Sequence, residues 1–154
     1  MDGPVIENMC NFKIENFNIN NLFKTFVLKV SFNDIEYSDL RFSKLLNSFE
    51  NQLKFIRDNK DIKHIFLYFD LSNAKLVIQT KKIKEFIDLI LNYSDMFENK
   101  LICTQLFADN SLMTFISKTI LLFYKTVKPL KILDNNEIDE KFILDNINNL
   151  SNDK

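Results

Sequence analysis

The chain has 154 residues, of which 46% are hydrophobic and 27% are charged, and its formal net charge is -1. This length suits one domain, and the composition excludes an intrinsically disordered chain, which needs low hydrophobicity and high net charge. The balanced charge gives no sign of a nucleic-acid partner, which usually requires an excess of basic side chains.

Two strands are predicted at the start of the chain. Residues 12–19 alternate apolar and polar side chains with a phase slip in the middle, and residues 23–32 alternate more cleanly, as is typical of half-buried strands. The pair Asn20 and Asn21 between them predicts a hairpin turn. Residues 1–10 are expected to form an N-terminal tail.

A helix, a buried strand and a second helix follow the hairpin. The segment 38–59 repeats apolar residues at helical spacing, and Ser38 and Asp39 can cap its first turn. Residues 62–71 are an almost continuous apolar run, which is typical of a central strand covered on both faces. Residues 81–92 show the strongest helical periodicity in the chain and place Lys82 on the polar face.

The remaining elements continue this alternation. Residues 100–107 predict a strand, and residues 112–127 predict a helix that ends before Pro129, because proline disfavours helix in the residue that precedes it. A short strand over 130–133 and a closing helix over 136–150 complete the pattern.

The predicted order is therefore β-β-α-β-α-β-α-β-α. Strands that alternate with helices predict a single α/β domain, here over residues 11–150, with a mixed and mostly parallel sheet. Residues 151–154 are expected to fray. Because the chain has 16 Phe and no Trp, its core should be rich in phenylalanine.

Glycine is almost absent, and this excludes several kinds of site. The single glycine is Gly3. Phosphate-binding loops need glycine so that the backbone can approach the ligand, so the usual P-loop, dinucleotide-binding and nucleophile-elbow motifs are excluded. No cofactor is indicated. Turns that need a positive φ must instead use Asn or Asp.

The cysteines and the apolar runs bear on location. Cys10 and Cys103 are far apart in the sequence, and no segment has the pattern of a signal peptide. No apolar run approaches the length of a transmembrane helix. We therefore expect a cytoplasmic protein without a transmembrane segment.

The element order and the sequence "LYFDLSNA", which contains Asp70 and Ser72, resemble the STAS domain, the fold of anti-sigma-factor antagonists. The resemblance covers roughly residues 12–150. In that family a D-S-[ST]-G sequence opens the next helix and carries a phosphorylation switch. The resemblance to the STAS domain implies a protein-interaction or regulatory module with a protein partner.

The matching positions of this chain have lost most of the switch motif. They carry Ile78, Gln79, Thr80 and Lys81, so that only Thr80 keeps a hydroxyl group. The resemblance therefore implies a module without the phosphorylation switch of the family.

A second resemblance implies a different function. The segment "NSLMTFISKTILLFYKTVKPLKI" is similar to a segment of the CRAL-TRIO fold, which has a related sheet topology. That resemblance implies a small domain that binds lipid or another hydrophobic ligand. Lysines such as Lys81, Lys82 and Lys84 could then form a basic edge for anionic lipid or an acidic partner, although a solvated helix face of mixed charge explains them better.

Each candidate site residue has two interpretations. Thr80 is either a vestigial phosphoacceptor, with Lys81 and Lys82 favouring the phosphate, or a helix cap. Asp70, beside Ser72, either belongs to a ligand site at the carboxyl end of a parallel strand or caps the following loop. We favour the cap in both cases.

Catalytic and metal sites are not indicated. The chain has one histidine, His64, at the start of a predicted strand and without a second histidine or a cysteine near it in sequence. No spacing of the acidic residues forms a recognisable catalytic set. The sequence therefore predicts a non-enzymatic protein.

Overall fold

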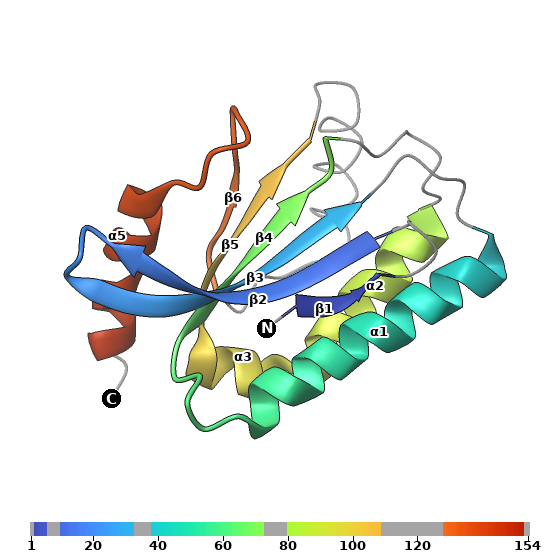
Figure 1. Ribbon diagram of the computed structural model, residues 1–154, viewed down its shortest axis with the longest axis horizontal. Helices are drawn as coiled ribbons and strands as arrows, with labels where there is room; N and C mark the ends of the chain where they lie inside the picture. The colour runs from blue at the N-terminus through green and yellow to red at the C-terminus, as the bar shows by residue number, and fades with distance from the viewer. Residues whose placement is uncertain (1, 6–9, 33–37, 73–79, 109–127, 153–154) are drawn as a thin grey trace.

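A six-stranded mixed sheet forms the centre of the computed structural model, which describes residues 2–5, 10–32, 38–72, 80–108 and 128–152 (Figure 1). The strands are β1 (Asp2–Val5), β2 (Cys10–Ile19), β3 (Phe23–Phe32), β4 (Ile65–Asp70), β5 (Leu101–Phe107) and β6 (Leu130–Ile132). The helices are α1 (Asp39–Asp58), α2 (Thr80–Asn92), α3 (Ser94–Lys100) and α5 (Glu140–Asn152).

The strands lie side by side in their chain order. The pairs β1–β2 and β2–β3 are antiparallel, whereas β3–β4, β4–β5 and β5–β6 are parallel. The predicted class, a single α/β domain with a mixed and mostly parallel sheet, is confirmed. Asp2–Val5 pairs with β2, although these residues were assigned to a tail. The helix predicted over 112–127 lies outside the described residues.

The hairpin between β2 and β3 turns without glycine. Asn20 and Asn21 have φ angles of 51° and 58°, and the Leu22 N–H donates to the Ile19 carbonyl at 3.0 Å. Two successive positive φ angles give the turn a twist that matches the strands it joins, and Asn tolerates this conformation better than most residues. The predicted hairpin is confirmed.

The phase slip in β2 has a simple cause. Phe12 and Ile14 pack in the core on the α1 side of the sheet, whereas Phe17 and Ile19 pack on the α5 side. The pairing of β2 with β3 is regular throughout. The strand therefore has no irregularity, and its two halves bury opposite faces.

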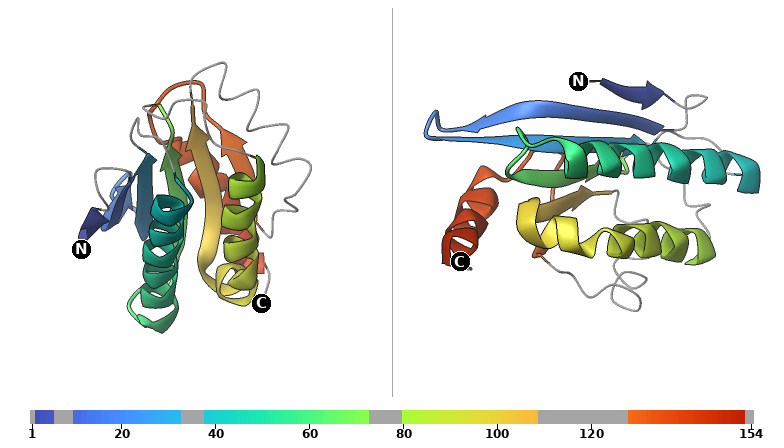
Figure 2. Two further views of the ribbon diagram at one scale, coloured as in Figure 1. Left: turned by 90° about the vertical axis from the view of Figure 1, so that its right-hand side faces the viewer. Right: turned by 90° about the horizontal axis from the view of Figure 1, so that it is seen from below.

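A cluster of phenylalanine rings fills the space between the sheet and helices α1 and α2. The Phe49 ring of α1 stacks on Phe86 of α2 at 4.5 Å between centroids, and on Phe12 of β2 at 5.7 Å. Phe86 also contacts Phe69 of β4 at 5.8 Å and Phe32 of β3 at 5.9 Å. Figure 2 shows α1 and α2 side by side. The prediction of a phenylalanine-rich core is confirmed.

Helix α5 covers part of the opposite face. Its Ile143 is fully buried with Phe66 and Cys103 of the sheet. Alternate residues of β4 enter the two cores, so this strand is covered on both faces as predicted. Cys10, which was expected in a tail, is also fully buried, because it begins β2.

A buried glutamine fastens the start of α5 to the sheet. The Gln105 Nε2 donates to the Asp139 carbonyl at 2.9 Å, and its Oε1 accepts from the Asp139 N–H at 2.8 Å. Asp139 Oδ1 accepts from the Phe142 N–H at 3.1 Å, so it caps the helix. Tyr68 Oη donates to the Asn136 carbonyl at 2.6 Å. One polar residue in an apolar strand thus positions α5.

Strand β5 has an extra residue relative to β4, and a buried hydroxyl lies next to Gln105 in the sequence. Ile65 pairs with Leu101 but Leu67 pairs with Thr104, so β5 has one more residue than β4 in this interval and forms a bulge. Thr104 is 4% exposed, and its buried Oγ1 has no hydrogen-bond partner among the described residues. Burying an unpaired hydroxyl is unfavourable by about 1–3 kcal/mol.

Replacing Gln105 by Leu should destabilise the fold by about 2 kcal/mol, because the N–H and carbonyl of Asp139 would lose their partners in a buried position. Urea unfolding followed by circular dichroism measures the change. An unchanged midpoint would show that Gln105 does not fasten α5.

Replacing Thr104 by Val should instead stabilise the protein. The side chains have similar volumes, so the substitution removes the unpaired hydroxyl without opening a cavity, and we expect a gain of about 1 kcal/mol. The same urea titration tests it, with Thr104→Ser as the control that keeps the hydroxyl and loses a methyl group. A loss of stability in the valine variant would contradict the assignment.

Candidate functional site

The carboxyl ends of the parallel strands form the edge where α/β sheets gather their ligand sites. The register places Ser31 of β3 beside Asp70 of β4, and Asp70 beside Phe107 of β5. The Leu71 N–H donates to the Phe107 carbonyl at 2.7 Å, so the pairing of these strands continues past the end of β4. Asp70 is therefore held at the centre of this edge.

Asp70 and Ser72 form a local turn. Asp70 Oδ1 accepts from the Ser72 N–H at 3.0 Å and from the Ser72 Oγ at 2.6 Å. This is the pattern in which an aspartate caps its own loop. It agrees with the capping interpretation, and a role of either residue in binding a partner stays a prediction.

The other candidate residues lie at the start of α2. Thr80 is the first residue of that helix, its side chain lies outside the described part of the structure, and its role as a phosphoacceptor stays a prediction. Lys81 is exposed. Lys82 was predicted on the polar face, and this was wrong: it is only 7% exposed, and its Nζ lies 3.5 Å from Oδ1 of Asp39.

The contact between Lys82 and Asp39 explains this burial. Asp39 begins α1, and the start of α2 lies against it because both helices lead from the carboxyl edge of the sheet back to its other end. The structure therefore joins Lys82 to α1, whereas Asp70 and Ser72 bond to each other.

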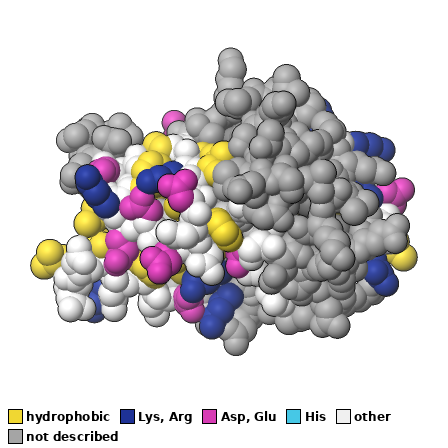
Figure 3. Space-filling view, turned by 90° about the horizontal axis from the view of Figure 1, so that it is seen from above, with side chains coloured by type: hydrophobic (Ala, Val, Ile, Leu, Met, Phe, Trp, Pro, Cys, Tyr) yellow, Lys and Arg dark blue, Asp and Glu magenta, His cyan; other side chains and the backbone are white. Residues whose placement is uncertain are grey.

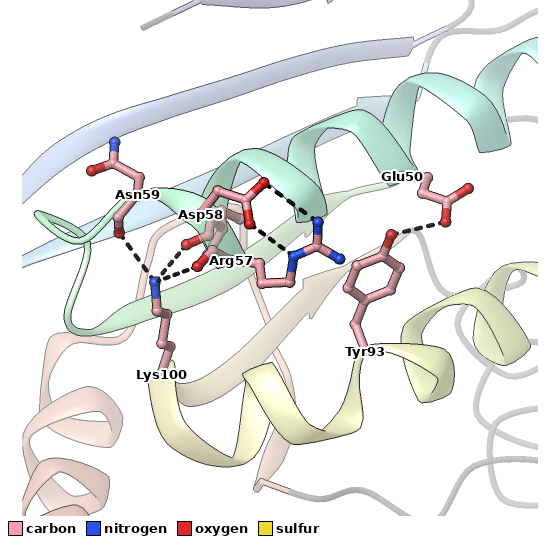
Figure 4. A network of polar contacts seen from close by, with 7 residues as sticks. Glu50, Arg57, Asp58, Asn59, Tyr93 and Lys100 are labelled. Carbon is pink, nitrogen blue, oxygen red and sulfur yellow. Dashed lines mark hydrogen bonds and ion pairs between the residues drawn. The ribbon is translucent and has the colours of Figure 1, made fainter.

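The last turn of α1 is joined to the end of α3, as Figure 4 shows. Lys100 Nζ, at the end of α3, donates to the carbonyls of Ile56 at 2.6 Å, Asn59 at 3.1 Å and Arg57 at 3.4 Å. These carbonyls lie at or just beyond the last turn of α1, where helical partners are missing. Burial lowers the pKa of the Lys100 ammonium, but its contacts are those of a cationic cap.

Tyr93 adds a second link between these helices. Its hydroxyl donates to Glu50 Oε2 at 2.8 Å, and the Arg57 guanidinium lies 5.9 Å from the centre of its ring (Figure 4). Burial, followed by the Glu50 carboxylate, raises the pKa of Tyr93. The phenol therefore stays protonated at neutral pH, as a hydrogen-bond donor rather than a general base.

A shallow hollow lies between β6 and α5. Its volume is about 210 Å³, and it is lined by Lys131, Leu133, Asp134, Asn135, Glu137, Ile138 and Asp139. Lys131 forms an ion pair with Asp139, which lowers the pKa of the carboxyl group. In the part of the chain that the structure describes, no three His, Cys, Asp or Glu side chains are grouped to hold a metal ion.

The cysteines are placed for packing. Cys10 and Cys103 are both fully buried, and burial raises the pKa of both thiols, that of Cys103 to about 12. A thiol with a raised pKa is a poor nucleophile.

The described surface in Figure 3 interleaves basic and acidic side chains. None of the described helices is long and apolar enough to span a membrane.

Comparison with known proteins gives a fold similarity only. No protein-family model matches this chain, and no curated protein matches it. It is similar to the crystal structure of an uncharacterized protein of the DUF3478 family from Shewanella loihica PV-4, described as having a SpoIIAA-like fold. The identity is 12%, the TM-score is 0.42, and the match covers 89% of this chain and 92% of that chain. No site residue is carried over from it.

Replacing Lys100 by Met should destabilise the protein by about 1–2 kcal/mol, since three carbonyls at the end of α1 would lose their donor while the alkyl packing is kept. Thermal or urea unfolding measures this. The matched control is Lys84→Met, which removes an exposed lysine from a pair within α2 and should change stability by less than about 0.5 kcal/mol. Equal effects of the two substitutions would contradict the capping role.

Proposed function

We propose that the chain is a non-enzymatic, STAS-like protein-interaction or regulatory module that acts by binding another protein. The polar groups that sequence analysis offered for chemistry are engaged within the fold, as with Asp70 and Ser72. Lys82 likewise contacts Asp39. These contacts support a role in which the surface, rather than a reactive group, is used.

The observation that carries the proposal is the apolar surface left on the rigid elements. Leu22 at the tip of the hairpin is 88% exposed, and Leu40 and Phe55 on α1 are 69% and 40% exposed. The helix and the hairpin that present them are fixed by packing and turn geometry, so little ordering would oppose binding.

The phosphorylation switch is not part of the proposal. Of the positions that match the motif, only Thr80 has a hydroxyl. Intact-mass measurement of protein from the native source should give the unmodified mass, and a stoichiometric phosphate on Thr80 would restore the switch.

The lipid-binding alternative has no observation in its favour among the described residues. Contacting rings fill the space between the sheet and helices α1 and α2. We therefore propose no second function.

Capture of partners on the full chain from the native source, followed by mass spectrometry, tests the proposed function. We expect one protein at a stoichiometric amount, released by an excess of the free chain. A heat-unfolded sample of the same chain is the control for adhesive binding. Recovery of no stoichiometric protein, or equal recovery on the unfolded control, would refute the proposal.

A further inference from the structure

We infer that two copies of this chain pair edge to edge through the half of β2 nearest the hairpin turn. We call residues 15–19 the open edge of β2. Antiparallel pairing there, across a two-fold axis at Phe17, would join two six-stranded sheets into one continuous sheet. The occupant of this edge is a second copy, so the inference stands or falls separately from the proposed binding of another protein.

Strand β1 covers the outer side of β2 along part of its length. It pairs with Asn11 and Lys13, whereas β2 continues to Ile19. Among the described residues, no strand pairs with residues 15–19 on that side. The right-hand view of Figure 2 shows this half of β2 outermost, with no described element beyond it. An edge of this kind offers backbone N–H and C=O groups to another chain.

The hairpin turn determines which of these backbone groups point outward. The Ile19 carbonyl accepts from the Leu22 N–H at 3.0 Å within the turn, so the backbone polar groups of Ile19 point toward β3. Successive residues of a strand point these groups to alternate sides, and the pairing of β2 with β3 is regular. Asn16 and Asn18 therefore direct an N–H and a C=O outward, whereas those of Phe17 point toward β3.

The open edge lacks the features that usually keep edge strands apart. Those features are proline, β-bulges and charged side chains, lysine above all. Residues 15–19 contain no proline and no lysine, and their pairing with β3 has no bulge. The one charged side chain among them, Glu15, forms ion pairs with Lys29 at 2.6 Å and with Lys13 at 3.4 Å. Two copies would therefore meet without an unpaired carboxylate between them.

The sequence of the open edge fits a second copy because it is symmetric about Phe17. The residues on either side are both asparagines, Asn16 and Asn18. In an antiparallel pair centred on Phe17, the outward groups of Asn16 bond to those of Asn18 of the second copy, and the reverse. A two-fold contact must be self-complementary in this way. Both asparagines are exposed, so their side chains can also bond across the pair.

Phe17 supplies the apolar centre of the contact. Its ring is half-buried and meets the Phe66 ring edge to face at 5.2 Å, so its position is fixed before pairing. In the centred register Phe17 lies opposite its own copy in a pair without backbone hydrogen bonds, where side chains come closest. The exposed part of each ring would then be buried against the other.

Sedimentation velocity of the full chain over a range of concentrations tests the inference. Because the paired segment is short, we expect a weak dimer with a Kd of about 10–100 µM. The double variant Asn16→Lys, Asn18→Lys should raise that Kd at least about tenfold, since like charges would lie opposite each other. The matched control is Asn47→Lys, Asn51→Lys at exposed positions of α1, which adds the same charge and should leave the Kd unchanged.

Amide hydrogen exchange, followed by NMR at low and high concentration, gives a second readout. The N–H groups of Asn16 and Asn18 should become protected as the dimer forms. The Phe17 N–H, which points toward β3, should keep its protection unchanged. This alternation distinguishes pairing at the open edge from self-association through any other surface.

A chain that stays monomeric up to about 1 mM would overturn the inference. So would a dimer that the Asn16, Asn18 variant leaves intact, or one that the α1 control weakens equally. All four substituted positions are exposed, so circular dichroism should show the native fold in both variants. None of these outcomes bears on whether the chain captures another protein.

Discussion

The stacked rings of Phe49 and Phe86 join helices α1 and α2 to each other and to the sheet, and the rest of this side of the fold depends on that contact. Phe49 comes from α1 and Phe86 from α2, and together they contact rings from β2, β3 and β4. Aromatic rings bury large areas and favour stacked or edge-to-face geometries, so a cluster of this kind sets both the distance and the angle between a helix and a sheet. The positions of α1 and α2 on the sheet, and with them the contact between Lys82 and Asp39, therefore depend on the packing of these rings.

Polar side chains complete this arrangement at the places where apolar packing cannot specify a position. Lys82 connects the start of α2 to the start of α1, and Lys100 connects the end of α3 to the end of α1. Gln105 bonds to both the N–H and the carbonyl of Asp139, as a neighbouring strand would. Each of these residues satisfies backbone or charged groups that would otherwise be unpaired. Several polar groups that by residue type alone could be catalytic or binding residues therefore stabilise the fold instead.

Local patterns in the sequence predicted most of the described helices and strands. Features that depend on contacts between distant segments could not be predicted in this way. The hairpin at Asn20 and Asn21 and the cap at Ser38 followed from neighbouring residues alone. The burial of Lys82 could not be predicted, because it depends on the start of α1 lying against α2. In the candidate site, the Asp70–Ser72 turn is local, so it could be predicted from the sequence. The contact between Lys82 and Asp39 joins residues far apart in sequence and could not.

The glycine-free hairpin has a consequence for the order in which the chain folds. Strands β2 and β3 are joined by three residues, so their pairing closes a very short loop, and hairpins form within microseconds. The next strand must return across a helix before it can pair, as the bond from Thr25 to His64 across 39 residues shows. Closing so long a loop is slower, and it is easier against a strand that is already straight and in register. Two asparagines at a turn therefore give the parallel half of the sheet the template on which it assembles.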